Sequence, residues 1–382
     1  MINQRVLSYS ENYLELDEYL KFYEVKNILL VCGRSIEKLQ INDFFSKMPL
    51  RLGVNVVKFS DFTPNPDYNS VIKGIDILRK NSCDCIIAVG GGSAIDVAKS
   101  IKAFCNMQDP ENYLHQNIVS NDIMLIAIPT TAGTGSEATH FAVIYYNGEK
   151  QSVAHESCLP EAIVLDPRLL NTLPLYQKKV TMLDALCHSI ESFWAIKSTR
   201  ESKVYSKQAI ELILHHMDSY LANDILGNEK LLLAAHIAGK AINITTTTAG
   251  HAMAYKLSSV YGIPHGHAVA LALNEVWPYM LEHMDLCADV RGVSYLEQTL
   301  DELARILGGN GINDGPIIFK EILSVLGINL LEAQSKNDIN ILANAVNSQR
   351  LKNNPIALSD LDLQNLYESM LQQHNERRNN ES

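Results

Sequence analysis

The sequence predicts an α/β domain with a parallel sheet, followed by an all-helical domain. Short apolar segments bounded by turn residues alternate with helical patterns in the first half, as in βαβ units. After Leu173-Pro174 the strand-like segments stop and only helical patterns follow. A length of 382 residues is typical of about two domains. We therefore place the first domain at residues 1–178 and the second at residues 179–382.

Five buried strands are expected in the first domain, with helical patterns around residues 71–79 and 94–102 between them. Asn147-Gly148 favours a tight turn because both residues tolerate positive φ, so it predicts a hairpin. The strands are expected at Asn27–Gly33, Val54–Phe59, Asp84–Gly90, Met124–Pro129 and Glu161–Asp166, and the hairpin at Phe141–Tyr146 with Gln151–His155.

Six helices are expected in the second domain. Apolar residues recur there at the spacing of one helix face, which predicts helices that pack on one another. The expected helices are Thr181–Ile196, Glu201–Ala222, Asn228–Ile244, Ala268–Glu282, Tyr295–Leu307 and Pro316–Leu326.

The composition is typical of a packed globular protein with neither a nucleic acid nor a membrane as its partner. Hydrophobic residues make up 47% of the chain, and 32 basic against 43 acidic residues give a net charge of −11. No apolar stretch approaches the ~18 residues of a membrane span, and residues 1–20 do not resemble a secretory signal. Seven scattered cysteines without CxxC spacing fit reduced thiols. We expect a cytoplasmic protein.

A glycine-rich segment predicts a phosphate-binding loop. The strand ending at Gly90 continues directly into Gly91-Gly92-Ser93 and then into a helix. Glycines let phosphates approach the backbone, and the free N–H groups at a helix start attract a pyrophosphate. The segment 129–137, PTTAGTGSE, follows another strand and brings hydroxyls and glycines to the same sheet edge. The alternative is a tight turn without a ligand.

Four residues predict a metal site. Asp184 and His188 lie four apart in a helical pattern and so share one helix face. That pair alone is more often a surface hydrogen bond. His251 and His265 follow, the latter in Pro264-His-Gly266, where a turn aims the imidazole before the next helix begins. One carboxylate and three imidazoles suit Fe²⁺ or Zn²⁺, and the four together favour the metal site.

These motifs resemble the iron-containing (group III) alcohol dehydrogenases over nearly the whole chain. The shared motifs are GGGSAIDVAK at 90–99, PTTAGTGSE at 129–137, DxxxH at 184–188, His251 with His265 in PHG, and RLKNNP at 350–355. The resemblance implies an N-terminal α/β dinucleotide-binding domain and an all-α C-terminal domain, with the metal between them. Dehydroquinate synthase shares this two-domain plan.

The resemblance also implies roles for individual residues. Asp184, His188, His251 and His265 correspond to the metal ligands. The residues expected at the cofactor are Gly91, Gly92 and Ser93 at the pyrophosphate, Thr130, Thr131 and Thr134 beside the nicotinamide half, Asn65 near the adenosine and Lys150 at a ribose, together with Asp96.

The loop after the first strand departs from the family pattern. Many members have an acidic residue there that binds the ribose 2′-hydroxyl, whereas this chain has Cys32-Gly33-Arg34-Ser35. Gly33 leaves room, and Arg34 or Ser35 could meet a 2′-phosphate, so NADPH is favoured while NADH stays a candidate. The alternative is that Arg34 points into solvent.

A second departure concerns the proton donor. Many members have another His four residues after the third ligand, where this chain has Tyr255. His267, two residues after a ligand, could supply the proton instead, as could water. The alternative is that His267 only begins a helix. We therefore name Tyr255 and His267 as candidate catalytic residues.

Within the family, residues 245–267, together with residues 152–160, most resemble phosphonoacetaldehyde reductases. Hydroxyls at Thr245–Thr248 and the ammonium of Lys256 lie next to two ligands in the sequence, where a dianionic phosphonate would need donors. Thr247 and Lys256, with Lys150 as a further candidate, are therefore the expected substrate contacts. The alternative is that the threonines cap a helix and Lys256 is solvated.

The sequence thus predicts a metal-dependent NAD(P)H oxidoreductase that reduces a small aldehyde to a primary alcohol. The expected reaction converts phosphonoacetaldehyde to 2-hydroxyethylphosphonate. The first alternative is a general short-chain alcohol or lactaldehyde-type dehydrogenase. More remote alternatives are a dehydroquinate synthase-like lyase and a non-catalytic binding protein. We expect a homodimer or a higher homo-oligomer.

Overall fold

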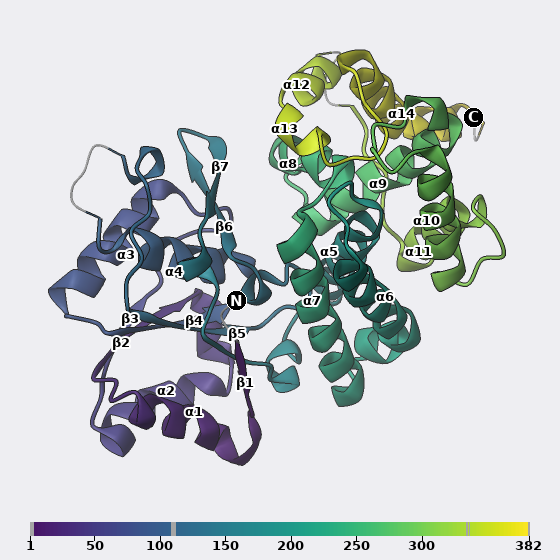
Figure 1. Ribbon diagram of the computed structural model, residues 1–382. Coiled ribbons are helices and arrows are strands. Elements are labelled where there is room, and N and C mark those ends of the chain that lie inside the picture. The colour runs from purple at the N-terminus through teal and green to yellow at the C-terminus, as the bar shows by residue number, and fades with distance from the viewer. Residues whose placement is uncertain (1–3, 108–111, 334, 336, 381–382) are drawn as a thin grey trace. The chain divides into compact units, whose positions relative to one another are not determined.

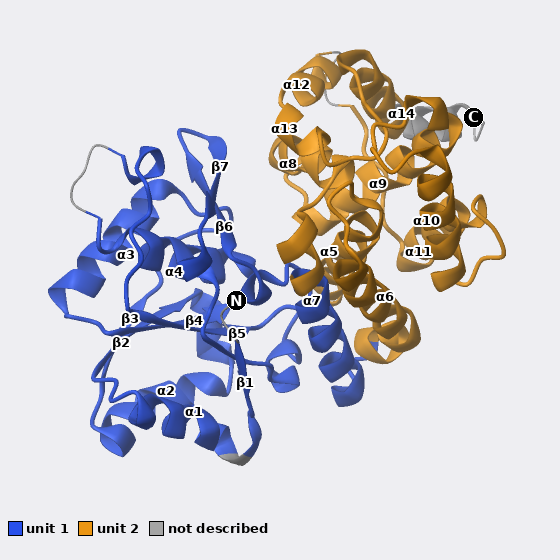
Figure 2. Cartoon of the chain, in the orientation of Figure 1, with its two compact units in different colours: residues 1–174, 222–239 blue, residues 175–221, 240–382 orange. Residues whose placement is uncertain are grey.

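The computed structural model of the protein describes residues 4–107, 112–333, 335 and 337–380 (Figure 1). Its chain forms two compact units, coloured in Figure 2: residues 1–174 with 222–239, and residues 175–221 with 240–382. The first is an α/β unit and the second is helical, so the predicted fold class is confirmed.

The compact units differ from the expected division at residue 178. They meet at residues 174 and 175, and α7 (Ile225–Thr245) belongs to the first unit as far as residue 239. The reason is close packing: a Cβ at Gly239 would lie 2.4 Å from the carbonyl oxygen of Gly135. Helical periodicity shows that α7 is a helix but not which unit it packs on. The boundary of independently folding domains near 178 stays a prediction.

The α/β unit is built on a six-stranded parallel sheet with the strand order β1-β8-β5-β4-β2-β3. Five of its strands are those expected from the sequence. The sixth, β1, is an edge strand of three residues, which is too short to show a periodic pattern. The strands are β1 (Arg5–Leu7), β2 (Asn27–Cys32), β3 (Asn55–Phe59), β4 (Cys85–Gly90), β5 (Met124–Pro129) and β8 (Ala162–Val164).

Helices cover both faces of this sheet (Figure 1). Because side chains alternate along a strand, Leu29 and Val31 of β2 join one apolar cluster and Ile28 and Leu30 join the other. The first cluster includes α3 (Tyr68–Lys80) and α4 (Gly92–Phe104); the second includes α1 (Ser10–Phe22) and α2 (Ile41–Leu52). This two-sided burial explains why the strands are continuous apolar runs.

The strand order places a switch point between β2 and β4. The chain goes from β2 to β3 on one side, whereas β4 is followed by β5 on the other side. Ligands of open parallel sheets bind at the carboxyl ends of the strands at such a point. Gly33 and Gly91 are the residues that directly follow these two strand ends.

The predicted hairpin is confirmed as a separate two-stranded antiparallel sheet of β6 (Phe141–Tyr146) and β7 (Glu149–Ala154). Asn147 and Gly148 form its turn with φ of 52° and 77°. In its register Tyr145 faces Lys150.

The helical unit contains the remaining expected helices and four shorter or less periodic ones. The expected helices are α5 (Leu175–Trp194), α6 (Arg200–Leu221), α9 (His265–Glu282), α10 (Val293–Ile306) and α11 (Asp314–Leu326). Those not expected are α8 (Ala249–Tyr261), α12 (Asp338–Asn344), α13 (Ser348–Leu351) and α14 (Asp360–Asn380).

The cysteines and the helices of the described chain bear on the expected reduced thiols and the expected lack of a membrane span. All seven cysteines are free thiols, and six of them are buried. Among the described helices, none combines the length and the apolar character needed to cross a bilayer.

Candidate functional site

Three of the four expected metal ligands meet inside the helical unit. Asp184 and His188 lie one turn apart on α5, and His251 lies on α8. Their exposed fractions are 3%, 6% and 1%, and one ligand atom from each lies within 4.8 Å of the other two. The His188 and His251 rings stack with centroids 4.3 Å apart. Such a buried group of one carboxylate and two imidazoles could hold a divalent cation.

His265, the fourth expected ligand, stands beside this group. It is the first residue of α9, is half-buried, and its ring centroid lies 5.5 Å from that of His251. Gly266 explains the approach, since a Cβ there would lie 2.0 Å from the carbonyl oxygen of Val180 and 2.9 Å from the Cβ of Asp184. Only a glycine lets the first turn of α9 pack this closely on α5.

The electrostatics of the group also suit a cation. Burial alone would raise the pKa of Asp184, but His188, His251 and His265 hold it well below its usual range. Burial lowers the pKa of His251, yet Glu191 and Asp184 outweigh this and raise it to about 9. Asp184 Oδ1 and His251 Nε2 lie 3.5 Å apart, and neither buried atom makes a hydrogen bond. Buried polar atoms are normally satisfied, so these two fit a bound metal.

Glu191 is part of this group and was not predicted from the sequence. It is fully buried on α5, and its Oε2 contacts Nδ1 of His251. Its Oε1 accepts hydrogen bonds from the N–H groups of Thr248 and His251 and from the Thr248 hydroxyl. The signal was present, because Glu191 follows Asp184 by seven and His188 by three residues and so shares their helix face.

The two candidate catalytic residues have different surroundings. Tyr255 stacks on His265, with centroids 4.9 Å apart, and its hydroxyl accepts a hydrogen bond from Arg350. Burial raises the pKa of Tyr255, and the Arg350 guanidinium opposes this. His267 instead hydrogen bonds through Nδ1 to the Tyr176 hydroxyl and through Nε2 to the Asn329 carbonyl, both at 2.8 Å. The structure therefore brings Tyr255, rather than His267, into contact with an expected ligand.

Of the expected substrate residues, Thr247 precedes α8 and Lys256 lies within it. The Thr245–Thr248 turn precedes this helix and is held by Asn353, whose Nδ2 donates to the carbonyls of Thr245 and Thr247 at 2.8 and 3.1 Å. Within the described part of the chain, neither the Thr247 hydroxyl nor the Lys256 ammonium has a hydrogen-bond or ion-pair partner. Both side chains are half-buried. Their role as substrate contacts stays a prediction.

The glycine-rich loop forms as expected in the α/β unit. Gly91 precedes α4, and Gly92 is its first residue, followed by the half-buried Ser93. A Cβ at Gly91 would lie 3.2 Å from the Thr131 side chain, and one at Gly92 would lie 2.9 Å from Cγ2 of Thr134. The 129–137 segment therefore packs directly on the loop, with Thr130 buried at the end of β5.

Asp96 and Lys99 fasten this segment from α4. Asp96 accepts hydrogen bonds from the Ser136 hydroxyl at 2.6 Å and from the Val143 N–H at 3.1 Å. Burial raises its pKa, while Lys99 and Lys150 oppose the shift. Lys99 is fully buried, and burial lowers its pKa to about 8. Its ammonium donates to the carbonyls of Ser136 and Phe141 and to the hydroxyls of Ser136 and Thr139.

The remaining expected cofactor residues lie in two turns and on one strand of the α/β unit. Gly33 follows β2 with extended backbone, and the exposed Arg34 and Ser35 come next. Asn65 is exposed with a φ of 57°. Lys150 is half-buried on β7 and close enough to Asp96 to lower its pKa.

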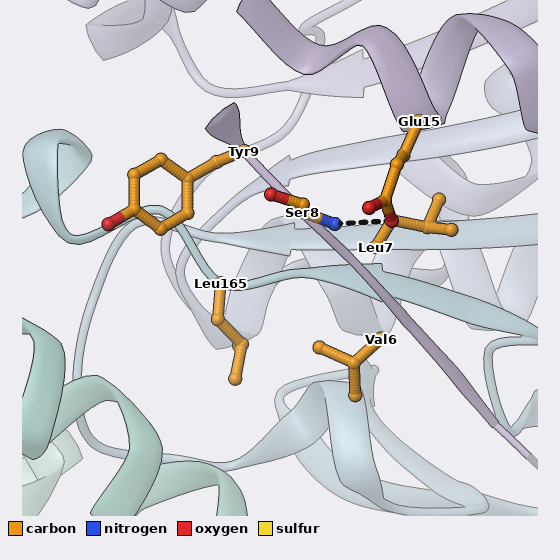
Figure 3. A pocket seen from close by; sticks show the side chains of 6 residues that line it. All are labelled: Val6, Leu7, Ser8, Tyr9, Glu15 and Leu165. Atoms are coloured by element: carbon orange, nitrogen blue, oxygen red, sulfur yellow. Dashed lines mark hydrogen bonds between the residues drawn. The ribbon is translucent and has the colours of Figure 1, made fainter. Parts of the chain in front are cut away.

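A small cavity of about 320 Å³ lies at the end of β1, apart from the expected site residues (Figure 3). Val6, Leu7, Ser8, Tyr9, Glu15 and Leu165 line it. The Ser8 N–H donates to Glu15 Oε2 at 2.9 Å (Figure 3), so the carboxylate is already engaged.

Comparison with known proteins gives consistent matches over both units. The iron-containing alcohol dehydrogenase model matches residues 3–167, and the C-terminal model of the Fe-containing alcohol dehydrogenase family matches residues 178–371. A phosphonoacetaldehyde reductase from Streptomyces viridochromogenes is 32% identical over 73% of this chain and 74% of that protein. An NADPH-dependent butanol dehydrogenase from Clostridium saccharobutylicum is 32% identical over 69% of each chain.

The solved structures include a sulfoacetaldehyde reductase from Bifidobacterium kashiwanohense in complex with NAD⁺. It aligns with a TM-score of 0.85 at 25% sequence identity, over 97% of both chains. The match therefore extends over both compact units of the chain.

Proposed function

The chain belongs to the iron-containing alcohol dehydrogenase family, and we propose that it reduces phosphonoacetaldehyde to 2-hydroxyethylphosphonate. The observation that carries the enzymatic part is the buried group of Asp184, His188 and His251, with two polar atoms that make no hydrogen bond. These residues, with His265 beside them, would hold Fe²⁺, or Zn²⁺ in its place.

The chemistry divides between the bound groups and the chain. A divalent cation supplies Lewis-acid stabilisation of charge on the carbonyl oxygen, and a nicotinamide supplies the hydride. Asp184 contributes a carboxylate that stays ionised, which favours retention of a cation. We favour Tyr255 over His267 as the proton donor. Tyr255 contacts His265, whereas both ring nitrogens of His267 are hydrogen bonded to Tyr176 and Asn329.

The charged tail of the substrate is proposed to meet donors around α8. Thr247 and Lys256 lie before and within this helix and make no competing hydrogen bond within the described residues. A charge-assisted hydrogen bond contributes roughly 1.5–3 kcal/mol, so each contact would raise kcat/KM for a phosphonate substrate by about ten- to a hundred-fold. The 32% identity to a phosphonoacetaldehyde reductase supports the same substrate.

NADPH is the proposed cofactor, with NADH as the alternative. The support is the absence of an acidic side chain at Gly33, the residue that follows β2 at the switch point of the sheet. Arg34 and Ser35 follow it in exposed positions, where they could contact a 2′-phosphate. We also propose a homo-oligomer, supported by the edge position of β1, whose Val6 is 57% exposed.

The deciding experiment compares phosphonoacetaldehyde with propanal, a neutral aldehyde of similar size. Enzyme loaded with Fe²⁺ or Zn²⁺ is assayed with each aldehyde through the absorbance of NADPH and, separately, of NADH. We expect kcat/KM for phosphonoacetaldehyde to exceed that for propanal by at least about ten-fold. Equal values would favour the general short-chain dehydrogenase, which the butanol dehydrogenase relative supports. No turnover of any small aldehyde would reject the reductase itself.

A further inference from the structure

We infer that Glu191 is a positioning residue that keeps a proton on Nδ1 of His251, so that Nε2 is the nitrogen that gives up its proton and faces the metal. The inference rests on the proposed metal site. Glu191 is not one of the four expected ligands. Its effect on metal affinity should be separable from its effect on folding.

The orientation of the Glu191 carboxylate is set at the start of α8. Oε1 accepts from the N–H groups of Thr248 and His251, both at 3.2 Å, and from the Thr248 hydroxyl at 2.7 Å. Trp194 Nε1 donates to that hydroxyl at 3.0 Å, so the hydroxyl gives its own proton to Glu191. Neither backbone N–H can act as an acceptor. The oxygen at this position must therefore accept hydrogen bonds.

The second carboxylate oxygen then determines the state of His251. Oε2 contacts Nδ1 of His251, and an ionised carboxylate can only accept, so Nδ1 must carry the proton. In a neutral imidazole the other nitrogen, Nε2, is then the one with a free lone pair. Nε2 is the atom that lies 3.5 Å from Asp184 Oδ1 and makes no hydrogen bond. A carboxylate on the distal nitrogen also makes a ligating imidazole more basic.

Gly250 shows that the helix start is shaped around this carboxylate. A Cβ at Gly250 would lie 3.1 Å from Oε1 of Glu191 and 3.1 Å from Leu273. A glycine within a helix costs roughly 0.5–1 kcal/mol relative to alanine. Here it leaves the space in which Glu191 reaches both the backbone and the imidazole.

Two variants of Glu191 separate its effect on the orientation of His251 from its effect on the stability of α8. In Glu191→Gln the amide oxygen must stay on the N–H groups of α8, so its NH₂ faces Nδ1 of His251. Nδ1 then has to accept, and the proton moves to Nε2, where it blocks metal binding. Glu191→Ala removes the contact without imposing a tautomer, and water can satisfy Nδ1. We therefore expect the isosteric glutamine to harm metal binding more than the truncation does.

The control is Thr248→Val, which removes one hydrogen bond to Oε1 and leaves the contact between Glu191 and His251 in place. Zn²⁺ affinity of the metal-stripped full chain is measured by competition with a chromophoric chelator, and Tm is measured without metal. We expect a loss of affinity of about ten- to a hundred-fold or more in E191Q and a smaller loss in E191A. In T248V we expect a lower Tm and an affinity within about three-fold of wild type.

Wild-type affinity in E191Q, or a larger loss in E191A than in E191Q, overturns the inference. Should E191A not fold, the affinity of E191Q alone decides between these results. If the wild-type chain binds no Zn²⁺, the proposed metal site fails and the inference fails with it. If it binds Zn²⁺ but reduces no aldehyde, only the proposed function fails.

Discussion

The phenol ring of Tyr255 lies nearly parallel to the imidazole of His265, with centroids 4.9 Å apart and an angle of 11° between the planes. Arg350 donates a hydrogen bond to the Tyr255 hydroxyl, and its guanidinium carbon lies 4.7 Å from the ring centre. Tyr255 is also one turn after His251 on α8. The Tyr255 ring is therefore held against one expected ligand, His265, while Arg350 fixes its hydroxyl.

Removing that hydroxyl tests whether Tyr255 supplies the proton. In Tyr255→Phe the ring and its stacking on His265 stay, so bound metal should be unchanged. If the hydroxyl donates the proton, kcat should fall by about a hundred-fold, the range of a lost general acid. His267→Gln is the comparison, because both ring nitrogens of His267 are hydrogen bonded to Tyr176 and Asn329. We expect its kcat to change less than about three-fold; the reverse order would make His267 the donor.

His265 tests the metal site at its most accessible ligand. His265→Ala should greatly reduce metal per chain and turnover together while the far-ultraviolet circular dichroism stays the same, because the side chain is half-buried at the start of α9. Elemental analysis measures the metal. The matched control is His283→Ala at the other end of α9, a half-buried histidine that also stacks on a tyrosine, Tyr279, with centroids 4.0 Å apart. Full metal content in H265A would remove His265 from the site.

Local patterns in the sequence predicted the parts of the site that lie within one element. Asp184 and His188 share a helix face, and the strand before Gly91 is a continuous apolar run, so both were visible in short windows. The helix α8 was missed because its residues are largely small or polar and include Gly250, which gives little amphipathic pattern. As a result, no helix was predicted for the segment that carries His251.

Contacts between distant segments were not predictable in this way. Glu191 meets His251 across 60 residues of sequence, and Asn353 meets Thr247 across 106. The RLKNNP motif was recognised, but its physical role appears only in the fold, where Arg350 reaches Tyr255 and Asn353 holds the turn before α8. Such pairings depend on how the helices pack, which periodicity within one helix does not specify.

The loop at Gly92 offers a steric test of the nucleotide site. A Cβ at Gly92 would lie 2.9 Å from Cγ2 and 3.0 Å from Oγ1 of Thr134, so Gly92→Ala should displace the 129–137 segment. We expect NADPH affinity, measured by fluorescence titration, to fall by about ten-fold or more while bound metal is retained. Gly311→Ala is the control, because no atom lies within 4 Å of a Cβ there and the backbone is unstrained. Unchanged NADPH affinity in G92A would place the nucleotide elsewhere.

Gly33 tests the choice between the two cofactors. Its φ of −70° and ψ of 164° suit any residue, and the nearest atom to a Cβ would be Ser35 Oγ at 3.6 Å, so Gly33→Asp fits without strain. The added carboxylate would repel a 2′-phosphate but accept a hydrogen bond from a 2′-hydroxyl. We expect kcat/KM with NADPH to fall by about a hundred-fold and kcat/KM with NADH to stay or rise. Gly33→Asn has the same shape without the charge and should affect NADPH far less. If both cofactors respond equally in G33D, this turn does not lie near the 2′ position, and the preference must come from other residues.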